Sequence, residues 1–392
     1  MEETWRWFGD QDPISLDYIK MTGASGVVTA LHDVPAGSVW TLDQICKKKN
    51  KIAAAGLRWS VCESIWMDDR IKFGGAAALP VINAWKDSLA NLGRAGIKVV
   101  CYNFMPVVDW TRTDLKFPLP GGGYALRFDM IDFIVYDVFV LKRPNARDFY
   151  DAGLVDKALL RFNALDDEEI LQLERNIIAG LPGGANEFSR QTIADRINAF
   201  NGIDAATMRR NLKEFLSQVV PVAEEFGVKL AIHPDDPPVP LFGLPRIVSN
   251  SDDIKFILSA VKSPMNGITL CTGSYGANPD NDLVSMAKTF SEHIHFAHLR
   301  NIQAQEDGSF FEAEHLQGAI DMVGVIDVLL KEEARRSSAG ETCALPIRPD
   351  HGHLLAGDIS TVSNPGYSYI GRLKGLAELR GVILTLQHEK AA

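Results

Sequence analysis

Residues 228–233 of this chain read VKLAIH, a short apolar run that ends in a histidine. Successive side chains of a strand point to opposite faces, so Ala231 and His233 would share one face while Leu230 and Ile232 share the other. The aliphatic face is expected to pack on helices, and the face with small and polar residues is expected to point inward. The run therefore predicts a parallel strand whose polar end opens into a pocket.

Seven further runs rich in aliphatic and β-branched residues recur along the chain, separated by amphipathic stretches of helical length. The eight expected strands are 26–31, 57–63, 97–104, 228–233, 267–272, 294–300, 344–350 and 382–387. The expected helices include 81–95, 206–226, 254–261 and 282–291. An open doubly wound sheet shows the same alternation, but the G-x-G-x-x-G turn that would follow its first strand is absent. We predict an α/β fold, a TIM (β/α)8 barrel.

One interval breaks the regular spacing of strands. Roughly a hundred residues separate the third expected strand from the fourth, which is too many for a loop and one helix. The segment contains the turn sequence PGGGY, a helical stretch at 166–179 and the loop LPGGANEF at 181–188. Neither glycine-rich piece is followed by the Lys-Ser/Thr of a phosphate-binding loop, so both are interpreted as turns. We expect a single barrel domain over 1–392, with an insertion at about 105–205, after the third strand, that caps the barrel.

Composition and charge limit the classes of protein to consider. The chain has 392 residues, 46% of them hydrophobic, with no apolar run of the length that a membrane span needs. Its 40 basic and 50 acidic residues give a net charge of −10, which opposes nucleic-acid binding. Five scattered cysteines and an N-terminus without an apolar run indicate a reduced, cytoplasmic protein. Because barrels of this size often pair, we also expect a homo-oligomer, a dimer.

Four consecutive strand ends in the second half of the chain carry residues that bind metal ions. They are His233 in AIHPDDPP, Cys271 in TLCTGSYG, His298 in FAHLRN and Asp350 in RPDHGH. Active sites of such barrels lie at the carboxyl ends of the strands, so these side chains are expected to meet. A lone histidine or cysteine would more often be a packing residue, but two imidazoles, a thiolate and a carboxylate together suit Mn²⁺, Fe²⁺, Co²⁺ or Zn²⁺.

Neighbouring side chains suit acid–base chemistry and the binding of a small anion. His351 follows a candidate ligand directly and Tyr367 lies in the next loop, so both are candidates for proton transfer; a surface histidine and a packed tyrosine are the alternatives. Four arginines near the expected loops are candidate partners for a substrate carboxylate, with ordinary ion pairs as the alternative. These are Arg6, Arg112, Arg300 and Arg348. Asp235 and Asp236 are expected to order their loop or to orient His233, with a carboxylate pair for acid–base work as the alternative.

Long stretches of the sequence resemble the mannonate dehydratases of hexuronate catabolism, and the likeness extends over nearly the whole chain. The stretches are RWFG at 6–9, GVVTALH at 26–32, CYNFMPVVDWTRTDL at 101–115, HPDDPP at 233–238, FGLPRIVS at 242–249, CTGSYG at 271–276, HLRN at 298–301, RPDHGH at 348–353 and NPGYSYIGRLKGLAELRGV at 364–382. The resemblance implies a xylose-isomerase-like TIM barrel that converts D-mannonate to 2-dehydro-3-deoxy-D-gluconate. It also implies Mn²⁺ or Fe²⁺ at the four candidate ligands, and proton-transfer roles for His351 and Tyr367.

The sequence departs from the family pattern in one loop and leaves other functions open. Residues 63–72 read ESIWMDDRIK, where the family is expected to have a proline and a histidine shortly after the Glu-Ser pair. Any role that this histidine has in the family therefore does not apply to this chain.

Two other functions are left open by the sequence. A metal-dependent sugar isomerase or epimerase of the same barrel group is the alternative enzyme, and a sugar-acid-binding or regulatory protein is the alternative from another class. Dehydration makes a 2-keto-3-deoxy acid whereas isomerisation conserves mass, so product analysis separates the two enzymes.

Overall fold

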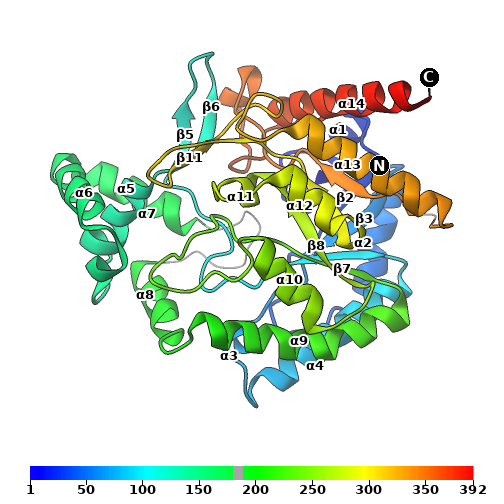
Figure 1. The fold of residues 1–392 in the computed structure, drawn as a ribbon, viewed down its shortest axis with the longest axis horizontal. Coiled ribbons are helices and arrows are strands. Elements are labelled where there is room, and N and C mark those ends of the chain that lie inside the picture. Colours follow the sequence, from blue (N-terminus) through cyan, green and yellow to red (C-terminus); the bar gives the residue numbers. More distant parts are fainter. Residues whose placement is uncertain (180–188, 342, 392) are drawn as a thin grey trace.

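The computed structural model describes residues 1–179, 189–341 and 343–391, and at its centre lies a closed barrel of parallel strands (Figure 1). The eight barrel strands are β1 (Glu2–Arg6), β2 (Gly26–Thr29), β3 (Arg58–Glu63), β4 (Val99–Tyr102), β7 (Lys229–Ile232), β8 (Asn266–Cys271), β9 (Ile294–His298) and β12 (Pro346–Arg348). The barrel closes where β1 pairs with β2 on one side and with β12 on the other. The predicted TIM (β/α)8 barrel is confirmed.

Helices alternate with the barrel strands along the chain. The main ones are α1 (Leu16–Met21), α2 (Leu42–Ala54), α4 (Ala78–Arg94), α9 (Ala205–Phe226), α10 (Ser251–Ala260), α12 (Leu283–Phe290), α13 (Met322–Ser338) and α14 (Tyr369–Ala391), with the short α3 (Asp69–Phe73) and α11 (Thr272–Gly276) between them. Local chemistry sets their ends. The side chain of Asp204 accepts a hydrogen bond from the first turn of α9, and Gly227 ends the helix in the left-handed conformation at φ 60°.

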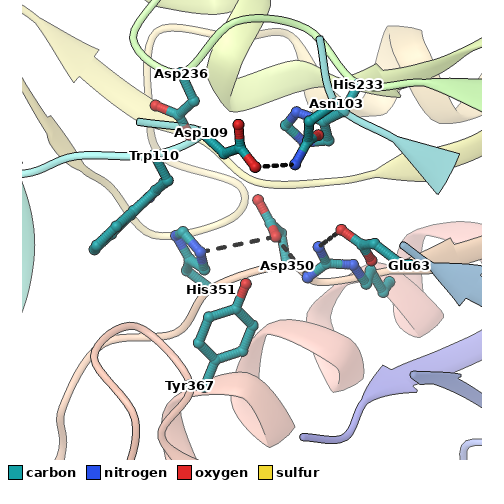
Figure 2. A pocket seen from close by; sticks show the side chains of 10 residues that line it. Glu63, Asn103, Asp109, Trp110, His233, Asp236, Asp350, His351 and Tyr367 are labelled. Carbon is teal, nitrogen blue, oxygen red and sulfur yellow. Dashed lines mark hydrogen bonds and ion pairs between the residues drawn. The ribbon is translucent and has the colours of Figure 1, made fainter. Parts of the chain in front are cut away.

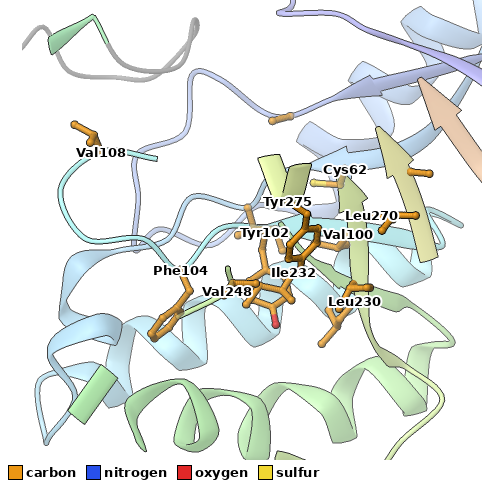
Figure 3. Packing of buried hydrophobic residues seen from close by; sticks show 14 of the residues in the cluster. Cys62, Val100, Tyr102, Phe104, Val108, Leu230, Ile232, Val248, Leu270 and Tyr275 are labelled. Atoms are coloured by element: carbon orange, nitrogen blue, oxygen red, sulfur yellow. The ribbon is translucent and has the colours of Figure 1, made fainter. Parts of the chain in front are cut away.

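The barrel interior and its outer surface have separate apolar packing. Side chains from five strands fill the interior below the rim; they are Val28, Val61, Val99, Cys101, Ala231 and Phe296. Their neighbours in sequence, such as Val100, Leu230 and Ile232, point outward into the larger core between the strands and the helices (Figure 3). The alternation predicted from VKLAIH is therefore confirmed: Ala231 faces inward while Leu230 and Ile232 face the helices.

The prediction of an eighth strand at 382–387 is wrong, because VILTLQ lies inside α14. Leu376, Leu379 and Ile383 of this helix are buried at helical spacing. Aliphatic and β-branched residues favour strands, but that tendency depends on context, and packing against the barrel overrides it. Although α14 is long and partly apolar, no helix in the described part of the chain combines the length and hydropathy that a membrane crossing requires.

The strand that closes the barrel is instead β1, whose sequence EETWR did not stand out as a strand. Its two glutamates obscure the apolar pattern, but both are held in ion pairs. Glu2 pairs with Arg58 at 2.6 Å, and Glu3 pairs with Arg380 of α14. Trp5 of the same strand is fully buried. The strand expected as the third, β4, is consequently the fourth of the barrel, and the insertion follows this fourth strand.

A second, smaller sheet forms from the insertion together with the segment after β9. The insertion begins with the hairpin β5 (Asp114–Pro118) and β6 (Tyr124–Phe128) and continues with the helices α5 (Met130–Ile134), α6 (Ala152–Ala164), α7 (Asp167–Ile178) and α8 (Arg190–Ala199). The hairpin joins β10 (Ile302–Ala304) and β11 (Phe310–Glu312) in the order β10-β11-β6-β5. Helices α5 to α8 lie to one side of the barrel (Figure 1). The loop LPGGANEF, 181–188, lies outside the described residues.

Candidate metal centre and active site

The four expected metal ligands converge at the carboxyl end of the barrel. His233 directly follows β7, Cys271 ends β8, His298 ends β9, and Asp350 stands two residues after β12. One donor atom from each of the first three lies within 4.8 Å of the other two. Asp350 completes the group, since its Oδ2 is 3.7 Å from the Cys271 sulfur and its Oδ1 is 3.8 Å from Nδ1 of His298.

Hydrogen bonds orient the two imidazole rings of this cluster. Nδ1 of His233 lies 2.7 Å from the carbonyl oxygen of Pro234, so that nitrogen donates its hydrogen there and Nε2 presents a lone pair to the cluster. Nε2 of His233 lies 3.2 Å from Nδ1 of His298. The expectation that Asp235 or Asp236 orients His233 is replaced by this backbone contact. Asp235 does order its loop, because it accepts hydrogen bonds from the backbone of Val248 and the hydroxyl of Ser249.

Burial and nearby charges set the protonation of the cluster. Burial lowers the pKa of His298 well below its ordinary value, and Arg348 adds to the effect, so the ring stays neutral with a lone pair available. Burial opposes ionisation of Asp350, but Arg348 at 2.6 Å keeps the pKa of this carboxyl well below its usual range. Burial raises the pKa of Cys271 to about 12, with Arg300 opposing the shift. Two imidazoles, a carboxylate and a thiol suit a first-row divalent cation, and a bound cation would displace the proton of the thiol.

A pocket opens beside the metal-type cluster. Its lining residues are Glu63, Asn103, Asp109, Trp110, His233, Asp236, Arg348, Asp350, His351 and Tyr367 (Figure 2). His351 and Tyr367, the two expected proton-transfer residues, lie together on one side of it, and their rings meet edge to face at 4.9 Å. The Tyr367 hydroxyl points into the pocket between His351 and Asp350 (Figure 2). Burial raises the pKa of this phenol to about 12, so it keeps its proton at neutral pH.

Comparison with known proteins gives the cluster and the pocket a context. A family model described as D-mannonate dehydratase (UxuA) matches residues 1–392. The chain belongs to the D-mannonate dehydratase family. It is 61% identical to Mannonate dehydratase 2 of Agrobacterium fabrum over 389 residues, which cover 99% of this chain and 98% of that protein. It is 54% identical to the Mannonate dehydratase of Saccharophagus degradans, with the same coverage.

Solved structures agree with this assignment. The crystal structure of mannonate dehydratase from Streptococcus suis serotype2 superposes with a TM-score of 0.76 at 34% identity, covering 100% of this chain and 95% of that chain. A D-tagatose 3-epimerase-like protein gives a TM-score of 0.53 at 12% identity over both full chains, which is a likeness of fold alone. The predicted enzyme class, a hydro-lyase, is confirmed, and the epimerase alternative gains no support beyond the shared barrel.

The four candidate arginines of this dehydratase occupy two different settings. Arg348 lines the pocket, where it also contacts Glu63 at 3.0 Å, and Arg6 lies next to it with Nη1 3.7 Å from Oε2 of Glu63. Arg112 and Arg300 are buried behind the pocket wall. Both of them pair with Asp236 and with Glu312. Only Arg348 of the four is among the pocket-lining residues.

Asp236 carries a charge deep in the dehydratase because two arginines compensate it. Burial alone would raise the pKa of this carboxyl, but Arg112 at 2.7 Å and Arg300 at 2.8 Å hold it well below its usual range. Asp236 thus lines the pocket as a carboxylate and fixes both guanidinium groups. Ordinary ion pairs, the alternative given for the four arginines in the sequence analysis, therefore describe Arg112 and Arg300.

Four residues that line the pocket of the dehydratase, and Glu312 behind it, were not expected from the sequence. Glu63 ends β3 and Asn103 directly follows β4, so the strand-end rule that indicated His233 also applies to them. Asp109 and Trp110 come from the irregular segment after β4, where Oδ2 of Asp109 lies 3.4 Å from the amide nitrogen of Asn103. Glu312 ends β11 of the second sheet, and no sequence signal connects that strand to the barrel rim.

Proposed function

We propose that this hydro-lyase removes water from D-mannonate to give 2-dehydro-3-deoxy-D-gluconate, with His351 and Tyr367 as its proton-transfer groups. The observation that carries the proposal is the convergence of His233, Cys271 and His298, with Asp350 next to them, beside a pocket that both residues line. A sugar acid fits this setting, because Arg348 offers positive charge for a carboxylate while Asn103 and Asp109 offer hydrogen-bonding groups for hydroxyls.

We propose His233, Cys271, His298 and Asp350 as the ligands of Mn²⁺ or Fe²⁺. A bound divalent cation supplies Lewis-acid charge that stabilises negative charge on a substrate carboxylate. The arginines hold the surrounding charges in place. Arg348 is buried against Asp350 and Glu63 and faces the pocket, so it also counters the charge that develops on the substrate. Arg6 adds positive charge beside it, while Arg112 and Arg300 act from behind the wall.

The reaction requires two proton transfers at adjacent carbons. One residue of the His351–Tyr367 pair takes the proton from C2, next to the carboxylate, and the electron pair left at C2 forms the C2–C3 double bond. The other gives a proton to the C3 hydroxyl, whose bond to carbon breaks as water leaves. The resulting enol then takes up a proton at C3 and loses the proton of its C2 hydroxyl, which gives the 2-keto acid. Both side chains face the same side of the pocket, as a short path between C2 and C3 requires (Figure 2).

Incubation of metal-loaded protein with D-mannonate tests the proposal. The expected product is a 2-keto-3-deoxy acid that forms with Mn²⁺ or Fe²⁺ and disappears with a chelator. A product of unchanged mass would instead indicate an isomerase or epimerase. Binding of D-mannonate without any conversion, under every divalent metal tried, would favour a binding protein.

We also propose that the enzyme is a cytoplasmic homodimer. All five cysteines are free thiols, which suits a reducing compartment. Light scattering coupled to size-exclusion chromatography measures the assembly directly: a mass near twice the 43.1 kDa of the chain supports the dimer. A mass near that of one chain overturns it. Cell fractionation tests the compartment.

A further inference from the structure

His351 has a hydrogen-bond partner that comes from outside the barrel, the carboxylate of Glu312. Oε1 of Glu312 lies 2.6 Å from Nδ1 of His351, and each residue is only 3% exposed. Glu312 ends β11, so this contact joins the second sheet to the loop that follows β12. A buried carboxylate at this distance from one ring nitrogen leaves the other ring nitrogen as the one that can face a substrate.

The groups around Nδ1 of His351 indicate that this nitrogen carries a hydrogen. Arg300 Nη1 lies 3.0 Å from the same Nδ1 and 2.7 Å from Oε1 of Glu312. A guanidinium has donors only, and a carboxylate has acceptors only. If Nδ1 lacked a hydrogen, its lone pair would face the Glu312 oxygen at 2.6 Å, which is repulsive. Nδ1 therefore donates to Glu312, and Arg300 donates to that carboxylate as well.

Packing keeps the ring of His351 from turning away from this contact. Trp110 and Tyr367 both meet it edge to face, at 5.9 and 4.9 Å between ring centroids. Gly366 lies against the ring, where an added Cβ would come within 3.1 Å of Cγ. Glu312 is itself held, because Arg112 Nη2 also donates to Oε1 at 3.1 Å. Nε2 of His351 is thereby left 3.9 Å from Oδ1 of Asp350, on the pocket side.

We propose that Glu312 is a positioning residue: it accepts the Nδ1 hydrogen of His351 and so makes Nε2 the nitrogen that exchanges a proton with the substrate. The inference rests on the proposed proton-transfer role of His351. It assigns the second sheet a part in catalysis, since β11 carries Glu312, and Arg112, one of the two arginine partners of Glu312, lies directly before β5.

Two substitutions of Glu312 distinguish its effect on the orientation of His351 from its effect on the charge balance with the arginines. Glu312→Asp keeps the negative charge that Arg112 and Arg300 need but is one methylene too short for the 2.6 Å contact. Glu312→Gln loses the charge but keeps the length and an oxygen that can accept the Nδ1 hydrogen. Positioning predicts a kcat loss of about 10- to 100-fold in Glu312→Asp, with KM and metal content nearly unchanged, and a much smaller loss in Glu312→Gln. A role in charge balance alone predicts the reverse order, which would overturn the proposal.

Glu332 provides the matched control. It is also buried, at 5% exposure, and also pairs with two arginines, Arg335 and Arg336, but it lies on α13 away from the pocket. Glu332→Asp and Glu332→Gln are expected to change the melting temperature and to leave kcat per bound metal unchanged. If the Glu332 variants keep the wild-type kcat, a loss of kcat in the Glu312 variants is not a general effect of altering a buried carboxylate.

A spectroscopic measurement tests the hydrogen position without relying on activity. In Zn²⁺-loaded protein labelled with ¹⁵N at histidine, the His351 signals are identified by their absence in His351→Asn, at a pH well above the ordinary histidine range. The wild type and Glu312→Gln are expected to carry the hydrogen on Nδ1, and Glu312→Asp to lose that preference. A ring protonated on Nε2 in the wild type would overturn the proposal. Full activity of His351→Asn would refute the proton-transfer role instead, whatever the hydrogen position.

Discussion

Nε2 of His233 lies 3.2 Å from Nδ1 of His298, although His233 follows β7 and His298 ends β9. His233 already donates its other ring hydrogen to Pro234, so a neutral pair can place at most one hydrogen between these nitrogens. The remaining lone pairs face the space shared with the Cys271 thiol and the Asp350 carboxylate. The barrel rim thus holds the four donors close together.

Metal binding is expected to stabilise the protein, and Cys271→Ala is expected to abolish that effect. A ligand that binds the folded state at about 100 times its Kd stabilises by about 2.7 kcal/mol. The melting temperature measured with and without Mn²⁺ checks this. Cys101→Ala is the matched control, because Cys101 is equally buried in the barrel but donates nothing to the cluster. A Cys271→Ala protein that still gains stability from Mn²⁺ would remove the thiol from the ligand set.

His351→Asn and Tyr367→Phe are each expected to lower kcat by about 10²- to 10⁴-fold while metal content stays at one ion per chain. Exchange of the C2 hydrogen in deuterated water then identifies the base, because the variant that retains the base still exchanges this hydrogen without releasing water. Tyr369→Phe serves as the control, since its hydroxyl donates to the carbonyl of Tyr18 outside the pocket. Loss of metal in either active-site variant would indicate a structural role.

Arg112→Leu is expected to destabilise the protein by about 3–5 kcal/mol, because it leaves the buried carboxylates Asp236 and Glu312 with one arginine fewer. Urea unfolding measures the change. Arg161→Ala, which breaks the partly exposed pair with Asp132, is expected to cost less than about 1 kcal/mol. Direct substrate binding by Arg112 would appear differently, as a raised KM in a protein of normal stability.

The metal-free protein is expected to lose stability as the pH falls below about 6.5, and His295 contributes to this loss. Burial lowers the pKa of His295 to about 3, while its Nδ1 donates to the carbonyl of Leu230 at 2.7 Å. In the unfolded chain the ring takes up a proton near pH 6.5, but in the folded protein it does not. Protonation therefore favours unfolding by roughly 1.4 kcal/mol for each pH unit between those two values.

The substitution His295→Asn keeps a donor near Leu230 and removes the titrating group. Urea unfolding of the chelator-treated variant at pH 6.5 and 5.5 is expected to show a loss smaller than that of the wild type by about 1 kcal/mol. An equal loss in both proteins would mean that His295 does not contribute. Other buried histidines, such as His315, remain in both proteins and cancel in the comparison.

The sequence predicted most of the barrel because seven of its strands are aliphatic runs bounded by turns. It failed at the two ends of the chain for physical reasons. The charges of Glu2 and Glu3 hide β1, and only the folded protein supplies the arginines that neutralise them. In α14 the aliphatic run 382–386 has the composition of a strand. Leu376 and Leu379, earlier in the same helix, are buried on one helix face, and the run itself does not show this.

The candidate site was predictable where residues directly follow strands, and unpredictable where a second element supplies them. His233 and Asp350 share the position at a strand end that barrel enzymes use for catalysis. Glu312 lies in a three-residue strand outside the barrel, and its contact with His351 depends on how β11 pairs with β6. Such pairing involves segments far apart in the sequence, and no local pattern encodes it.

Closure of the barrel by β1 and β12 has a consequence for synthesis on the ribosome. Glu2 pairs with Pro346 and Glu3 with Ile347, so the second edge of β1 stays uncovered until β12 has been made. Until residue 348 has left the exit tunnel, β1 and β9 both lack a neighbour, and Asp350 is not yet present to join the other three donors. The nascent chain therefore completes its catalytic centre only after β12 has been made, and a product truncated before Pro346 would expose two strand edges that promote aggregation.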